Sequence, residues 1–131
     1  MDNENVNFSI ILIRNKQKTQ SNFENRSSVD LSINDEFTVT IQTQLGTGYR
    51  WILENDSMST VQLKSEKVLS EDEEVNQVGQ FQHQTFHFKA IKEGEERIRL
   101  KYGRVWEKNK NPQKTIFVDL KVKNIGDNSN G

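Results

Sequence analysis

The chain contains a single alanine, Ala90, against ten valines, ten isoleucines, eight threonines and seven phenylalanines. Branched and aromatic side chains crowd a helix but fit the pleated, half-buried surface of a sheet. Helices are usually filled with alanine, leucine and glutamate. This bias predicts an all-β protein, and the length of 131 residues corresponds to one domain with one core.

Short runs of alternating hydrophobicity, separated by turn residues, predict seven or eight strands and favour a two-sheet sandwich. The expected strands and apolar runs are residues 6–14, 29–33, 36–43, 51–53, 60–63, 66–69, 81–90, 97–102 and 115–122. The inward-facing side chains predicted from the alternation are Val29, Leu31, Ile33, Phe37, Val39, Ile41, Phe86, Phe88, Ala90, Ile98, Leu100 and Tyr102.

Two connections between these runs bear on the topology. Asn34-Asp35 is a turn signal, and it predicts that residues 29–33 and 36–43 are neighbouring strands of one hairpin. Residues 15–28 are polar and offer few core candidates, which predicts a long loop or a partly disordered segment. We therefore divide the chain into an N-terminal strand and polar segment (1–28), a main domain (29–123) and a disordered tail (124–131).

Charge and cysteine content exclude several classes of function. The net charge is -1, which gives no electrostatic reason to bind nucleic acid or an anionic membrane. With no cysteine, the chain has no disulfide, zinc-thiolate site or cysteine nucleophile. No apolar run reaches the roughly 20 residues of a membrane span. The N-terminus lacks the layout of a signal peptide, so we expect either a cytoplasmic protein or a fragment of a longer precursor that is secreted or vacuolar.

The sequence contains few catalytic or metal-binding patterns. His83 and His87 fall on one face of a predicted strand, opposite Phe86 and Phe88, and we expect surface histidines with no metal and no cofactor. The chain has no G-x-S-x-G elbow and no phosphate-binding loop. A Ser-His-Asp triad is defined by geometry and stays open from sequence alone. We nevertheless expect a protein that is not an enzyme.

Two loops carry the residues of interest. Trp106 lies in a polar segment after Arg104, and tryptophan and arginine are the residue types most enriched in binding hot spots. The indole either folds back onto its own sandwich or contacts a partner, and composition leaves both readings open. Trp51 begins an apolar run and is expected in the core.

These loops resemble those of the chagasin-type inhibitors of cysteine peptidases, over roughly residues 29–123. The first loop of the family reads Asn-Pro-Thr-Thr-Gly-aromatic-x-Trp, and residues 44–51 read QLGTGYRW. The last loop reads Tyr-x-Arg-Pro-Trp, and residues 102–106 read YGRVW. Between them, Gly79 and Lys89-Ala90 match a glycine-containing loop and a strand that ends in Lys-Ala. The ordered set is more specific than any single motif, and the asparagine-rich style suggests the malarial, falstatin-like branch.

The resemblance implies an immunoglobulin-like β-sandwich with three binding loops at one end. It implies a reversible, competitive inhibitor whose loops occlude the active-site cleft of a papain-family protease, cathepsin L-like or falcipain-like, while the inhibitor is a monomer on its own. The segment 46–48 would lie over the catalytic thiol, and Trp106, supported by Arg104, would stack on an aromatic residue at the primed side. The implied protease-binding residues are Leu45, Gly46, Thr47, Gly48, Tyr49, Val78, Gly79, Gln80, Phe81, Arg104, Val105 and Trp106.

The chain also departs from the family pattern. Gln44-Leu45 stands in place of Asn-Pro, Gly46 in place of the first threonine, and Val105 in place of the proline of the last loop. Since proline fixes φ near about -65°, other contacts must hold these loops. The alternative from another class is a non-inhibitory immunoglobulin-like domain for adhesion or protein interaction, because sandwiches host many functions.

Overall fold

The structure is a computed structural model that describes residues 5–43, 48–70, 82–107 and 114–124. Within these ranges the chain forms no helix, and hence none that could cross a membrane. Nine strands are present, which confirms the all-β class and exceeds the expected count. They are β1 (Asn7–Arg14), β2 (Gln17–Glu24), β3 (Arg26–Ser32), β4 (Glu36–Thr43), β5 (Tyr49–Leu53), β6 (Val61–Ser70), β7 (Gln82–Ala90), β8 (Gly94–Arg104) and β9 (Lys114–Lys123).

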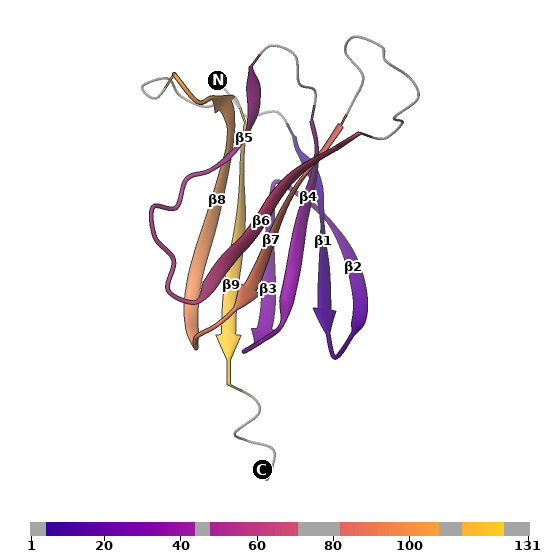
Figure 1. The fold of residues 1–131 in the computed structure, drawn as a ribbon, viewed down its shortest axis with the longest axis vertical. Helices are drawn as coiled ribbons and strands as arrows, with labels where there is room; N and C mark the ends of the chain where they lie inside the picture. Colours follow the sequence, from indigo (N-terminus) through magenta and orange to yellow (C-terminus); the bar gives the residue numbers. More distant parts are fainter. Residues whose placement is uncertain (1–4, 44–47, 71–81, 108–113, 125–131) are drawn as a thin grey trace.

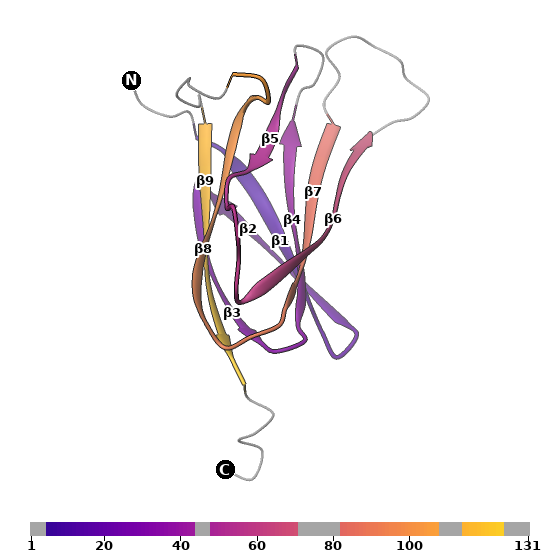
Figure 2. The same ribbon diagram turned by 60° about the vertical axis from the view of Figure 1, so that its left-hand side comes forward.

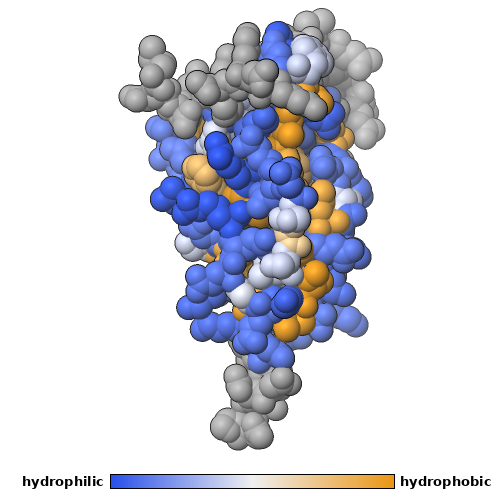
Figure 3. Space-filling model, turned by 90° about the vertical axis from the view of Figure 1, so that its left-hand side faces the viewer, coloured by the Kyte–Doolittle hydropathy of each residue, from blue (hydrophilic) through white to orange (hydrophobic). Residues whose placement is uncertain are grey.

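The strands form the two packed layers of a sandwich (Figures 1 and 2). One layer has the order β5-β8-β9-β3 and the other has the order β2-β1-β4-β7-β6. Neighbouring strands are antiparallel except β3 and β9, which are parallel. A single residue pair, Glu24 with Arg26, joins the layers between β2 and β3, whereas β5 and β6 end the strand order. Apolar residues are visible as a stripe down one face of the molecule (Figure 3).

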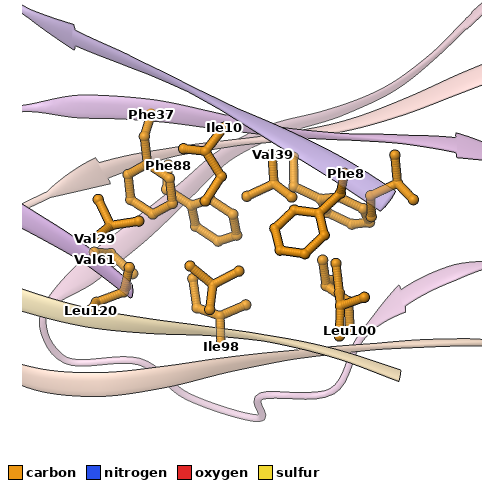
Figure 4. Close-up of a cluster of buried hydrophobic side chains, with 14 of the residues drawn as sticks. Phe8, Ile10, Val29, Phe37, Val39, Val61, Phe88, Ile98, Leu100 and Leu120 are labelled. Carbon is orange, nitrogen blue, oxygen red and sulfur yellow. The ribbon is translucent and has the colours of Figure 1, made fainter. Parts of the chain in front are cut away.

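The core consists of the inward-facing side chains of both layers (Figure 4). Phe37, Phe86 and Phe88 are fully buried, and the rings of Phe37 and Phe88 stack with centroids 5.0 Å apart. Ile98 and Leu100 face them from the other layer and are fully buried too. Each such side chain stabilises the fold by roughly 1.5–3 kcal/mol. The expected alternation is confirmed, because all the predicted inward-facing side chains are buried except Ile33 and Tyr102, which are partly buried.

The expected loop at residues 15–28 is wrong. Residues 17–24 form β2, which pairs with β1 along its whole length. The two strands are joined by Asn15 and Lys16, with φ of 52° and 67°, the backbone conformation of a tight two-residue hairpin turn. Most side chains of β2 are exposed, so hydrophobic alternation carried no signal there. The expected boundary after residue 28 falls inside β3, and β1 contributes Phe8 and Ile10 to the same core. Residues 125–131 of the expected tail lie outside the described residues.

The expected hairpin between residues 29–33 and 36–43 is also wrong, although its turn exists. Asn34 has a φ of 82°, and the N–H of Asp35 donates to the carbonyl of Ser32 at 2.9 Å. After this turn the chain crosses to the other layer, so β3 pairs with β9 and β4 pairs with β1 and β7. The two short strands expected at 60–63 and 66–69 are one strand, β6, with an irregularity between Leu63 and Ser65.

Candidate functional site

Three strand connections, β4 to β5, β6 to β7 and β8 to β9, leave the sandwich at the same end. Thr43 at the end of β4 pairs with Gln82 at the start of β7, which also pairs with Ser70 at the end of β6. Across the sandwich, Tyr49 at the start of β5 pairs with Arg104 at the end of β8. Figure 2 shows these strand ends together, above the rest of the molecule. We call this the loop end, and the opposite end the far end.

Only part of the predicted site can be placed. Gly48, Tyr49, Arg104, Val105 and Trp106 are described, and all five lie at the loop end. The other predicted binding residues lie outside the described residues, so their positions stay predictions: Leu45, Gly46, Thr47, Val78, Gly79, Gln80 and Phe81.

The indole of Trp106 lies directly over Gly48. A Cβ atom placed on Gly48 would be 2.5 Å from Cη2 of the indole, which is closer than two carbon atoms can approach. Gly48 also has a φ of +86°, a conformation that glycine adopts at little cost. The absence of a side chain at Gly48 is therefore what lets the first and last loops touch.

In spite of this contact, Trp106 is 69% exposed and its neighbour Val105 is 54% exposed. Large exposed apolar side chains are few in the described part of the chain, and these two are adjacent. The sequence left open whether the indole packs on its own sandwich or contacts a partner. In the structure one edge of the indole packs on Gly48. Most of its surface stays available to a partner.

Arg104 joins these aromatic groups. Its guanidinium lies over the ring of Tyr49, 4.4 Å from the centroid, and 6.0 Å from the centroid of Trp106. The same side chain forms an ion pair with Glu107 at 3.2 Å, and the N–H of Glu107 donates to the carbonyl of Arg104 at 3.0 Å. Cation–π contacts and a local ion pair together fix the orientation of the turn that carries Trp106.

Beneath Arg104, a column of aromatic rings connects the loop end to the core. Tyr49 stacks on Tyr102 with centroids 5.4 Å apart, and Tyr102 lies 5.4 Å from Trp51. Trp51 is only 2% exposed, which confirms its expected place in the core. Lys114 covers the same column, 5.2 Å from the centroid of Tyr102.

Gln84 is a residue of this site that the sequence analysis did not single out. It is fully buried, and its carboxamide forms two hydrogen bonds with the backbone of Trp51. A signal for it was present, because Gln84 continues the inward-facing series Phe86, Phe88 and Ala90 toward the loop end. A polar side chain in such a series needs a buried partner.

The two histidines lie on the outer face of the other layer, away from this cluster. His87 contacts Glu36, with 2.7 Å between Nε2 and Oε1, and His83 is half-buried. Across the described ranges, no group of three histidine, aspartate or glutamate residues is arranged to hold a metal ion.

Comparisons with known proteins identify the family of this arrangement. Residues 30–120 match the sequence model described as Chagasin family peptidase inhibitor I42. The chain belongs to the chagasin family of peptidase inhibitors. It is thus related to inhibitors rather than to enzymes, which agrees with the expectation from its motifs.

Two of the similar proteins come from Entamoeba histolytica. Amoebiasin-2 of Entamoeba histolytica is 27% identical over 100 residues, which cover 76% of this chain and 80% of that protein. The crystal structure of the cysteine protease inhibitor EhICP2 of the same organism superposes with a TM-score of 0.64 at 27% identity, covering 76% and 88% of the two chains. The solution structure of Amebosin, 18% identical, shares the fold with a TM-score of 0.59 over 75% and 97%. The chagasin-like fold is confirmed, and the suggested falstatin-like branch is not supported.

Proposed function

We propose that this chagasin-family protein is a reversible, competitive inhibitor of papain-family cysteine proteases, and that its loop end fills the active-site cleft. The main support for the proposal is the packing of the Trp106 indole against Gly48. This contact brings the first and last loops, which are far apart in the sequence, to one edge of a packed scaffold. It leaves most of the indole exposed.

Each loop has a proposed role. The backbone around Gly46, Thr47 and Gly48 lies over the catalytic thiol, since a glycine backbone enters a narrow cleft that a Cβ atom would block. Trp106 stacks on an aromatic side chain at the primed side of the cleft. The loop around Gly79 contacts the opposite side, so that the three loops exclude substrate without any chemical step.

The architecture favours tight binding because little order is lost on association. Trp51, Tyr102, Tyr49 and Arg104 connect the loop end to the core through ring contacts of 4.4–5.4 Å, so the exposed indole is presented on a stiff base. Preorganisation of this kind reduces the entropy lost when loops bind. An interface of standard size, about 1,600 Å² in total, is compatible with nanomolar affinity, or roughly -12 kcal/mol.

The alternative of a non-inhibitory adhesion or interaction domain is less favoured. The match to a peptidase inhibitor family covers residues 30–120, the part of the chain that carries all three loops. The cysteine protease inhibitor EhICP2 shares the fold at 27% identity.

A steady-state inhibition assay tests the proposal. Papain and cathepsin L, with their active sites titrated, are mixed with increasing inhibitor at several concentrations of a fluorogenic peptide substrate, and trypsin serves as a control. We expect an apparent inhibition constant in the nanomolar range that rises linearly with substrate, full recovery of activity on dilution, and unaffected trypsin. No inhibition at micromolar concentrations, or inhibition independent of substrate, would contradict the proposal.

A further inference from the structure

The side chain of Gln84 bridges the two layers just below the loop end. Its Oε1 accepts a hydrogen bond from the N–H of Trp51 at 2.9 Å, and its Nε2 donates to the carbonyl of the same residue at 2.7 Å. Gln84 lies on β7 and Trp51 on β5, two strands that belong to different layers and are not neighbours in the strand order. One carboxamide thus pairs with a residue of β5 as a neighbouring strand would.

Both partners need this pairing. Among the described strands, β5 is at the edge and pairs with β8 alone, so the backbone groups of Trp51 that point away from β8 have no strand to bond. Gln84 is fully buried, so its amide cannot turn to solvent. Buried polar groups left without a partner are unfavourable, and the two sets satisfy each other.

The bridge lies at the root of all three loops. β5 starts directly after the first loop and β7 directly after the middle loop. Trp51 contacts Tyr102, Tyr102 stacks on Tyr49, and Arg104 of the last loop lies over Tyr49. A shift of β5 relative to β7 would therefore change the spacing of the first and middle loops, and would move the base on which the last loop rests.

We propose that Gln84 is a positioning residue for inhibition, which holds the three loops in the spacing that fits the protease cleft through its two hydrogen bonds to Trp51. This inference rests on the proposed function and deepens it. Gln84 is buried and does not touch the protease, so its effect is on the fraction of free inhibitor molecules whose loops have the spacing that binds. A reduced population lowers the apparent association rate constant and leaves dissociation of the formed complex almost unchanged.

The test compares Gln84→Met, which retains length and loses both hydrogen bonds, with Val122→Ala. Val122 is buried at the far end of the sandwich, where it pairs with Gly94, so this control loses core packing without touching the loop end. Unfolding by denaturant shows that both variants are folded at the assay temperature. For Gln84→Met we expect the association rate constant with papain to fall by roughly 10-fold to 100-fold with the dissociation rate constant within about twofold, as a reduced competent population dictates.

The expected result for Val122→Ala is an unchanged pair of rate constants. Equal losses in both variants, or an unchanged association rate constant in Gln84→Met, would overturn the inference. If Gln84→Met does not fold, the same rate constants are measured for Gln84→Asn, and the same outcomes support or overturn the inference. The amide of Gln84→Asn is too short to reach both backbone groups of Trp51.

A measurement on the free protein separates this inference from the proposed function. Amide hydrogen exchange of Trp51, whose N–H donates to Gln84, should become faster in Gln84→Met, while exchange of Val118 on β9 stays slow. If the amide of Trp51 keeps its wild-type protection in Gln84→Met, the inference about Gln84 is wrong, whichever protease the protein inhibits. If wild type inhibits no papain-family protease, the proposed function fails, and the exchange data alone decide whether Gln84 positions β5.

Discussion

Replacement of Trp106 by alanine removes the largest exposed apolar surface of the described loop end. Tryptophan offers up to about 250 Å², and the 69% that is exposed in the free protein amounts to roughly 170 Å² available to a partner. At about 25 cal/mol per Å², full burial of this surface contributes up to about 4 kcal/mol. Hot-spot aromatics lose about 2–4 kcal/mol on truncation, so Trp106→Ala should weaken inhibition by about 30-fold to about 700-fold.

The loss should fall on binding rather than on folding. The indole contacts its own protein through Gly48 and Arg104 and stays 69% exposed, so the free energy of unfolding should drop by less than about 1 kcal/mol, as for an exposed substitution. Progress curves with papain give the two rate constants, and we expect most of the change in dissociation, as is usual for a lost interface contact.

Ile91 offers a matched control at the far end. It is 45% exposed and follows the last residue of β7, so Ile91→Ala also removes an exposed apolar side chain. Inhibition should be unchanged in this control. Equal inhibition by wild type and Trp106→Ala, or an equal loss in both variants, would refute the reasoning that the indole is a contact residue.

Three further predictions concern the supports of the fold and the site. Gly48→Ala should lower the free energy of unfolding by about 1–2 kcal/mol because of its positive φ. It should also displace the indole of Trp106, so the double variant Gly48→Ala/Trp106→Ala should bind papain no more weakly than Trp106→Ala alone. If the losses in binding free energy of the two single variants add in the double variant, the contact between Gly48 and Trp106 does not matter for binding. Asp35→Ala removes a carboxylate that accepts hydrogen bonds from Arg14 at 2.7 Å and 2.9 Å at the far end, so denaturant unfolding should show a loss of about 2–3 kcal/mol with unchanged inhibition. A hydrogen bond from Arg97 lowers the pKa of Asp119, so the stabilisation that this carboxylate gives the fold is full above the unfolded pKa of about 3.9 and is lost as the pH falls through the folded pKa. The difference in the free energy of unfolding between wild type and Asp119→Asn should therefore shrink in acid. A difference that stays constant with pH would contradict this.

The sequence predicted the strands whose side chains alternate between core and solvent. Phe37, Phe86, Phe88, Ile98 and Leu100 were placed correctly because burial on one face of a strand imposes a period of two on the sequence. β2 was missed because it is held by backbone pairing with β1 and buries almost nothing. Every residue type except proline can donate and accept backbone hydrogen bonds, so such a strand leaves only its turn as a signal.

Pairing between strands was harder to predict than the strands themselves. The turn at Asn34 and Asp35 is compatible with a hairpin and with a crossing between layers, and the alternation in the flanking runs is the same in both cases. The choice depends on partners distant in the sequence, since β3 pairs with β9 and β4 with β7. Local turn chemistry contains no information about them.

The same limit applies to the site. Motif order identified Gly48, Arg104 and Trp106 as loop residues, and the structure brings these three together. The sequence did not reveal that Arg104 lies over Tyr49 or that Gln84 bonds to Trp51, because each contact joins segments whose spacing depends on the packing of two layers.

The proposed inhibition requires the loop end to cover the catalytic thiol of a papain-family protease. The most direct measurement is the rate at which iodoacetamide alkylates that thiol, with and without a saturating amount of this inhibitor. We predict that alkylation in the complex slows to the rate set by dissociation, and that it recovers with Trp106→Ala at the same concentration. Alkylation at the free-enzyme rate in a complex that no longer cleaves substrate would show that the loop end does not cover the thiol.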